Sequence, residues 1–345
     1  MKQKRLHRSV NFDTDVDTLL PTLFSASEQA QKFLEHVKKS GGKVKLVLEL
    51  GGEDDVCMTM EASPELASMA RELKLQFRTG LIADGYNIRK VDFSKIHGVA
   101  GNDLNKLADA LELTDGANVL DLMCGYGAVS SHILGYAKDN GKSVRLSMCD
   151  LHKVQLDRIP DDVRSSVEDV TVSDARNLPY LDGKFDAVVI KMGLHEVPQI
   201  DQPLIFQQVF RVLKPGGRFV IWEVMPDTGE QQDAFTEQMQ KKNELAGYES
   251  IVVDRYFTRG EQMPWLFEEG GFVDVRQVFE ANFHQSTLGR LDSELGGDRT
   301  KLDALNAFVR RCTPQSIRPS VDYKDEGDSI SMKVPNRIFR AKKPE

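Results

Sequence analysis

The feature that most constrains this chain is the stretch "VLDLMCGYGAVSSHIL", which begins at Val119. An apolar run ends in Asp121, a turn containing Gly125 and Gly127 follows, and a pattern of helical period then resumes. Glycines adopt backbone angles closed to other residues, and they let a ligand approach the main chain without a Cβ in the way. Amide groups at the start of the next helix would face that ligand. The stretch predicts a strand, a ligand-binding turn and a helix, although an ordinary tight connection could use the same glycines.

Strand-like and helical segments alternate from Ala117 to Val224. The strand-like runs are rich in Val, Ile and Leu, and they are "ANVLDL", "SVRLSMCD", "VEDVTVSDA", "FDAVVIKMG" and "GRFVIWEV". Continuous apolar strands separated by helices are typical of a parallel sheet that is covered on both faces. The sequence therefore predicts a doubly wound, Rossmann-like α/β domain, with bounds at residues 102–345.

The segment before this domain, residues 1–101, mixes the two kinds of pattern. Strands are expected at 43–50 and 54–62, and helices near 27–39 and 64–77. We interpret this region as an α+β extension with a substrate-capping or assembly role.

Two features follow the predicted parallel sheet. A polar helical stretch suggests a lid segment at 226–262, and two late strands, "FVDVRQVFEANF" and "SISMKVPNRIFRAKK", enclose an insertion at 285–328. A helix is expected within the insertion, near Thr300 to Arg311. Such insertions carry substrate contacts about as commonly as they form plain solvated loops.

Composition narrows the class of protein. The net charge of −8 counts against a grip on nucleic acid that depends on phosphate contacts. The four cysteines form no CxxC pair and no metal-ligand cluster, which favours a reducing cytoplasm and predicts no metal site. The chain contains no apolar run of 18 residues, so we expect no membrane span.

Three acids stand in phase with three predicted strand ends. Asp121, Asp150 and Asp174 each close or follow one of the first three strands. In a doubly wound fold the carboxyl ends of the strands converge on the crevice that binds ligands, where a carboxylate can accept hydrogen bonds from ribose hydroxyls. Each acid could instead be a turn or capping residue, but three in phase favour a nucleoside-bearing cofactor.

The type of cofactor follows from two departures from a dinucleotide fingerprint. The third glycine position of that fingerprint is Ser130 here, and Asp121 beside the turn would repel a pyrophosphate. The same carboxylate would attract an ammonium group. The residues thus favour a cofactor with a positive charge over NAD.

The stretch from about Asp103 to Val224 resembles a class I S-adenosylmethionine-dependent methyltransferase, and is similar to the ubiquinone/menaquinone-type group that acts on small molecules. The motifs that carry the resemblance are "VLDLMCGYG", the strand-two acid, "SDARNLPYLDGKFDAVV" and "RVLKPGGRFVIWE". The resemblance implies a seven-stranded sheet, with six parallel strands and one antiparallel strand. It also implies S-adenosyl-L-methionine as the cofactor.

By this resemblance the glycine loop approaches the methionine part of the cofactor, Asp121 its amino group, Asp150 the ribose, and Asp174 with Ala175 the adenine. The implied cofactor-binding residues are Asp121, Met123, Gly125, Gly127, Asp150, Leu151, Asp174, Ala175 and Lys191. One position departs from the pattern, because Met123 stands where the family usually has its first glycine.

Candidates for the chemistry lie after the fourth strand, in "KMGLHEVP". His195 is a candidate catalytic base and substrate contact, because histidine titrates near neutrality; packing in the core is the alternative role. Glu196 is a second catalytic candidate, which could orient His195, and Glu223 is another acid of the expected crevice. Tyr86 is a candidate substrate contact.

The predicted reaction is an in-line transfer of the methyl group to a small molecule. Oxygen, sulfur and carbon acceptors are favoured over nitrogen, because no Asn/Asp-Pro-Pro-aromatic tetrad follows strand four. The alternatives are a protein or RNA methyltransferase, a catalytically inactive cofactor-binding partner subunit, and an oxidoreductase. A homodimer is left open.

Overall fold

The computed structural model describes residues 6–10, 45–51, 55–61, 101–247 and 255–345. The chain divides into two compact units, residues 1–81 and 82–345, which we describe separately.

The first unit contains a three-stranded antiparallel sheet. Its strands β1 (Leu6–Val10), β2 (Lys45–Gly51) and β3 (Asp55–Glu61) lie in the order β1-β2-β3. The two predicted strands of this region are confirmed, whereas β1 was not predicted from the sequence. The helices expected near 27–39 and 64–77 lie outside the described residues, and the domain boundary at residue 101 stays a prediction.

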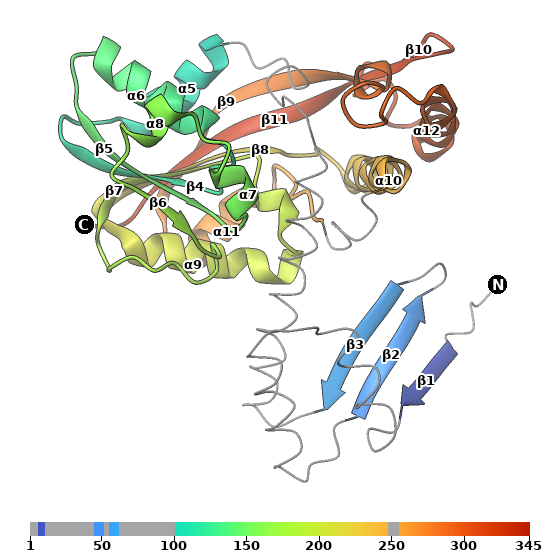
Figure 1. The fold of residues 1–345 in the computed structure, drawn as a ribbon, viewed down its shortest axis with the longest axis horizontal. Coiled ribbons are helices and arrows are strands. Elements are labelled where there is room, and N and C mark those ends of the chain that lie inside the picture. Colours follow the sequence, from blue (N-terminus) through green and yellow to red (C-terminus); the bar gives the residue numbers. More distant parts are fainter. Residues whose placement is uncertain (1–5, 11–44, 52–54, 62–100, 248–254) are drawn as a thin grey trace. The chain divides into compact units, whose positions relative to one another are not determined.

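The second unit is built on one large sheet (Figure 1). Its parallel strands lie side by side in the order β6 (Asp169–Val172), β5 (Val144–Asp150), β4 (Ala117–Leu122), β7 (Phe185–Lys191) and β8 (Leu213–Val224). β11 (Ile330–Lys342) pairs antiparallel with β8, and β9 (Val273–Ser286) pairs antiparallel with β11. β9 therefore runs in the same direction as the five parallel strands.

The Rossmann-like α/β fold is confirmed, with six strands in one direction and one against them. A short addition, β10 (Lys324–Asp325), pairs with the start of β11 and brings the sheet to eight strands instead of the expected seven. Two residues pair too briefly to leave a period-2 pattern in the sequence.

Helices cover the sheet and connect its strands. In the described residues of this unit the α-helices are α5 (Gly101–Leu111), α6 (Ala128–Asp139), α7 (Lys153–Leu156), α8 (Asp161–Arg164), α9 (Gln202–Val212), α10 (Gly229–Ala246), α11 (Met263–Glu269) and α12 (Arg299–Cys312). The same residues contain three 3₁₀ turns, η1 (Leu194–Glu196), η2 (Gln199–Asp201) and η3 (Leu288–Arg290). Figure 1 shows α6 and α9 on opposite sides of the sheet.

Alternation along the strands divides the core into two layers. Leu120 and Val188 pack with α9 and α11 on one face, while their neighbours Val119 and Val189 pack with α5 and α6 on the other. Successive strand residues point to opposite faces, so a strand that is apolar throughout must be covered on both. This layering leaves the carboxyl ends of the strands as the edge where polar residues gather.

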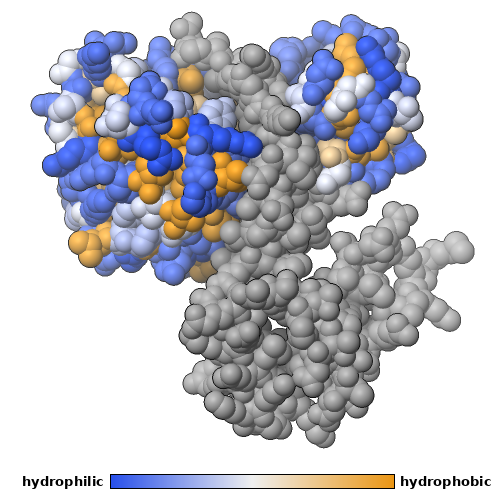
Figure 2. Space-filling model, viewed as in Figure 1, coloured by the Kyte–Doolittle hydropathy of each residue, from blue (hydrophilic) through white to orange (hydrophobic). Residues whose placement is uncertain are grey.

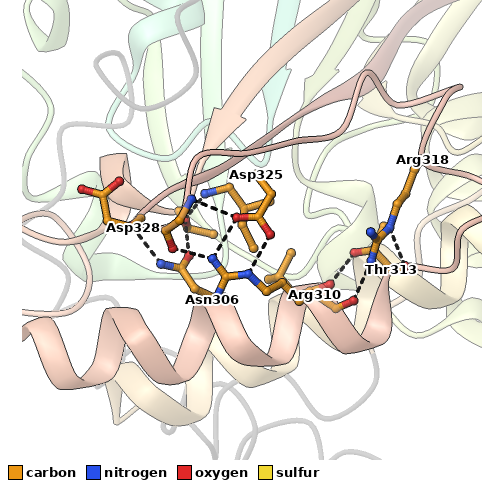
Figure 3. A network of polar contacts seen from close by, with 10 residues as sticks. Asn306, Arg310, Thr313, Arg318, Asp325 and Asp328 are labelled. Carbon is orange, nitrogen blue, oxygen red and sulfur yellow. Dashed lines mark hydrogen bonds and ion pairs between the residues drawn. The ribbon is translucent and has the colours of Figure 1, made fainter.

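A separate hydrophobic cluster lies at the far end of the β9–β11 ladder. It joins α10 and α12 through Phe235, Leu302 and Leu305, and it reaches back to Phe257. The insertion 285–328, which contains η3, α12 and β10, also carries a polar network in which Arg310 binds Asp325 (Figure 3). The helix expected near Thr300 to Arg311 is confirmed as α12.

The described surface mixes hydrophilic and apolar residues, as Figure 2 shows for one face. No helix in the described part of the chain is both long enough and apolar enough to cross a lipid bilayer.

Candidate active site

The glycine loop lies between β4 and α6. Gly125 and Gly127 both have left-handed backbone angles, with φ of 56° and 87°. A Cβ on Gly125 would have no neighbouring atom within 4 Å, whereas a Cβ on Gly127 would lie 2.8 Å from Cε of Met148. The two glycines therefore serve different purposes. Gly127 allows the start of α6 to pack closely on β5, and Gly125 leaves its backbone open to approach.

Met123 also has a left-handed backbone, with φ of 60°. This conformation is costly for a residue with a Cβ. A Cβ added to Gly193, which follows β7, would lie 2.8 Å from Cβ of Met123. The methionine that replaces the family's usual glycine is thus accommodated by a glycine on the neighbouring connection, and the left-handed turn is retained.

Asp121 is buried at the end of β4, where its Oδ2 accepts a hydrogen bond from the Ser130 hydroxyl at 2.6 Å. The pKa of Asp121 is raised to about 7, chiefly by burial and to a smaller extent by the charge of Asp150, while hydrogen bonds from Ser130 oppose the shift. A buried carboxylate without full compensation favours a nearby positive charge. Ser130, the departure from the dinucleotide fingerprint, is thus a direct partner of this acid.

Asp150, the last residue of β5, binds the glycine loop through its carboxylate. Its Oδ2 accepts the backbone N–H of Gly125 at 2.8 Å, and its Oδ1 accepts the backbone N–H of His152 at 2.8 Å. Burial raises the pKa of Asp150, and these two N–H groups oppose that shift. The structure therefore brings Asp121, Asp150 and Gly125 together at one edge of the sheet.

Asp174 and Ala175 follow β6. Asp174 accepts hydrogen bonds from the backbone N–H of Arg176 at 2.8 Å and forms an ion pair with its guanidinium, which also binds Asp201. Ala175 is buried, and Leu151, after β5, is half-buried. The sequence did not indicate that Arg176 would form an ion pair with the Asp174 carboxylate.

Lys191 is the last residue of β7, at the same edge of the sheet. Its Nζ lies 5.1 Å from the centre of the Trp222 ring, and burial lowers the pKa of the amine, while the charges of Glu223 and Asp121 oppose that shift. The lysine therefore lies within electrostatic range of two carboxylates of the edge.

His195 lies in η1, the turn after β7, and its side chain is buried. Its Nδ1 lies 2.6 Å from Oε1 of Glu223, at the end of β8, and its backbone N–H donates to Oε2 of the same carboxylate at 3.3 Å. Glu196 turns the other way and forms an ion pair with Arg255 at 3.0 Å. The acid beside His195 in space is thus Glu223, not its neighbour in the chain.

Phe257 is a residue of this site that sequence reasoning missed. Its ring stacks on the His195 ring, with centroids 5.1 Å apart and planes 13° apart. Its backbone carbonyl accepts a hydrogen bond from the Gln232 side chain of α10 at 2.6 Å. A lone phenylalanine in an irregular segment carries no sequence pattern that would reveal this contact. Tyr86, the candidate substrate contact, lies outside the described residues.

Comparison with known proteins agrees with this geometry. A family profile described as "Methyltransferase domain" matches residues 119–217. The ubiquinone/menaquinone biosynthesis C-methyltransferase of Rickettsia akari is 25% identical over 168 residues, which cover 40% of this chain and 65% of that protein. The demethylmenaquinone methyltransferase of Lactobacillus johnsonii is 33% identical over 127 residues, covering 36% and 50%. The chain thus spans less than two thirds of the length of these relatives.

Solved structures share the fold. The YcgJ protein of Bacillus subtilis superposes with a TM-score of 0.60 at 14% identity, covering 71% of this chain and 100% of that chain. The BH2331 protein of Bacillus halodurans gives a TM-score of 0.58 at 20% identity over the same shares. The solved structures thus share the fold, and the sequence comparisons lead to one conclusion: residues 119–217 match a methyltransferase domain, and the chain is similar in sequence to the ubiquinone/menaquinone-type methyltransferases.

Proposed function

We propose that this chain transfers the methyl group of S-adenosylmethionine to a small-molecule acceptor by in-line displacement. The observation that carries the proposal is the pair of buried carboxylates, Asp121 and Asp150, beside the open face of Gly125. We further propose oxygen, sulfur or carbon as the methylated atom. The relative from Rickettsia akari is a C-methyltransferase, which adds weight to carbon.

The residues present fit this cofactor. Each oxygen of Asp150 accepts one backbone N–H in the described part of the chain, and a carboxylate offers about two acceptor positions per oxygen. Two positions therefore remain for the two hydroxyls of a ribose. Asp121 has a pKa of about 7, so an ammonium group beside it would favour the ionised form.

The remaining assignments extend the same site. We propose that Leu151, Asp174 and Ala175 contact the adenine, that Met123 and Gly127 shape the loop, and that Lys191 supports the charge balance at the edge. Glu196 stays a proposed catalytic residue, and Tyr86 stays a proposed substrate contact.

The cofactor supplies a methyl group that is already activated on a sulfonium. The protein must then hold the acceptor's lone pair in line with that carbon and exclude water. Positioning of this kind can contribute about 7–11 kcal/mol in favourable cases. The buried His195 and its stacked Phe257 would line the acceptor side, and the turn that carries Met123 and Gly125 would line the other.

Calorimetry with S-adenosylmethionine, S-adenosylhomocysteine and NAD tests the binding half of the proposal. We expect the first two ligands to bind and NAD not to bind; binding of NAD alone would overturn the proposed cofactor.

The transfer half of the proposal is tested by incubating the chain with methyl-labelled cofactor and a cell extract, which is then separated into small molecules, protein and RNA. We expect label among the small molecules. Label in protein or RNA would favour those acceptors, and binding without transfer would favour an inactive partner subunit.

The homodimer and the cytoplasmic location remain predictions. Sedimentation of the full chain and fractionation of cells that express it would test them.

A further inference from the structure

His195 and Glu223 form a close contact between two titratable side chains, and the cofactor assignment uses neither of them. It spans 2.6 Å, and both side chains are buried, with 7% and 1% of their surface exposed. Glu223 belongs to β8 and His195 to the turn after β7, so the pair bridges two adjacent strand ends. A buried polar pair of this kind must be well satisfied to be tolerated.

Among the described residues, the backbone groups that bind Glu223 are donors. Oε1 also accepts the backbone N–H of Val224 at 2.8 Å, and Oε2 accepts the backbone N–H of His195 at 3.3 Å. An oxygen that already accepts one N–H in this geometry acts as an acceptor toward the imidazole as well. The proton in the short contact therefore belongs to Nδ1 of His195.

One further residue contacts the imidazole ring directly, and the segment that carries this residue is itself tied to its neighbours. Phe257 stacks on one face, and the backbone carbonyl of His195 accepts the N–H of Tyr256 at 3.1 Å. The segment that carries Phe257 is tied to α9, because Gln202 donates to the carbonyl of Tyr256 at 3.2 Å and accepts from the Thr258 hydroxyl at 2.6 Å. A 180° flip of this ring would break the contact between Nδ1 and Glu223 and would interrupt the stacking on Phe257.

The opposite nitrogen, Nε2, has no hydrogen-bond partner among the described residues. It is also not fully buried. With the proton on Nδ1, Nε2 carries a lone pair. We infer that Glu223 is a positioning residue, which fixes His195 with its proton on Nδ1 and so presents Nε2 as the base that takes a proton from the methyl acceptor.

This inference rests on the proposed function and narrows the acceptor class. As the acceptor's electron pair forms the bond to the methyl carbon, the carbon–sulfur pair stays on sulfur, and the acceptor's proton passes to Nε2 of His195. The imidazolium that forms is balanced by the Glu223 carboxylate, and water later removes the proton. Acceptors of this class lose a proton on methylation, in contrast to tertiary amines and thioethers. A positioned base of this kind contributes a factor of about 10² to 10⁴.

The test is the position of the histidine proton, which nuclear magnetic resonance reads without any methyl acceptor. The full chain is labelled with ¹⁵N-histidine and measured at pH 8 with and without S-adenosylhomocysteine. His195→Gln assigns the signal by difference. Glu223→Leu removes the acceptor of the Nδ1 proton, and Glu223→Gln is the matched control that retains an acceptor oxygen without the charge.

We expect the wild type and Glu223→Gln to carry the proton on Nδ1, and Glu223→Leu to show a mixture of both tautomers. A wild-type proton on Nε2, or an unchanged tautomer in Glu223→Leu, would overturn the inference. The wild-type spectrum alone decides where the proton lies, so the test stands even if the leucine variant does not fold. Failure to bind S-adenosylhomocysteine would count against the proposed function, whereas the tautomer tests only the inference.

Discussion

Carboxylates at the edge of the sheet and carboxylates in the insertion 285–328 have opposite surroundings. Asp121 and Asp150 are buried and take their hydrogen bonds from a serine hydroxyl and from backbone amides. Asp325 in the insertion is exposed, and it forms a two-pronged ion pair with Arg310 at 2.7 and 2.8 Å (Figure 3). These surroundings shift the pKa values of the two sets of carboxylates in opposite directions.

Burial raises the pKa of Asp121 to about 7, whereas the hydrogen bond from Arg310 lowers the pKa of Asp325 to about 2. The acid in the insertion already has its cation. The acids at the edge hold negative charge that the described protein compensates only in part. We propose that a positive ligand completes the charge balance at the edge, whereas Asp325 in the insertion is already paired with Arg310.

The largest effect is expected for Asp150→Ala. The variant removes the acceptor of the Gly125 and His152 amides and the proposed ribose anchor, and a charged hydrogen bond is worth about 1.5–3 kcal/mol. We expect the affinity for S-adenosylhomocysteine to fall at least about 100-fold by calorimetry. Asp325→Ala is the matched control in the insertion. Equal affinities of the two variants would remove Asp150 from the site.

The second effect is a pH-dependent stability of Asp121→Asn. The folded protein holds a proton on Asp121 up to about pH 7, whereas the unfolded chain releases it near 3.8, so stability from this group is present at low pH and is lost as pH rises through 7. The melting temperature of the variant relative to wild type should therefore rise between pH 5 and pH 8, by roughly 5 °C. Scanning fluorimetry without ligand measures both melting temperatures. If the difference between variant and wild type does not change with pH, the pKa of Asp121 is not raised by burial.

A third effect separates Gly125 from a glycine of the insertion. Gly125 and Gly327 both have positive φ, and a Cβ on either would meet nothing within 4 Å. Alanine at each position should lower the free energy of unfolding similarly, by about 1 kcal/mol. Only Gly125→Ala should weaken binding of S-adenosylhomocysteine, because its Cβ would enter the space that the cofactor is proposed to use. If Gly327→Ala weakens binding equally, the loop has no special role.

The smallest effect is expected for Arg310→Gln. Exposed ion pairs stabilise proteins little, because water and salt screen them and both side chains lose freedom. We expect the melting temperature to change by no more than about 2 °C, and the change to shrink further in 1 M salt. A large loss that salt does not alter would mean that the network in Figure 3 supports the fold as strongly as the buried edge does.

Much of the fold could be predicted because its signals are local. The strands from β4 to β8, the helices α6, α9 and α12, and the two late strands all follow periodicities that a few neighbouring residues express. β1 and β10 were missed, because β1 has apolar residues only at its two ends and β10 is just two residues long. The glycines of the loop and the acids at the strand ends were readable for the same reason, since each stands next to the strand that positions it.

The sequence by itself determined the order of strands and helices, the left-handed turn after β4 and the gathering of acids at one sheet edge. Only the tertiary structure decided which side chains meet there. It paired His195 with Glu223 across 28 positions of sequence, stacked Phe257 on the imidazole, turned Glu196 toward Arg255, and set Met123 against Gly193. The physical reason is that periodicity is a property of adjacent residues, whereas these contacts depend on which strands lie side by side and how their connections pack.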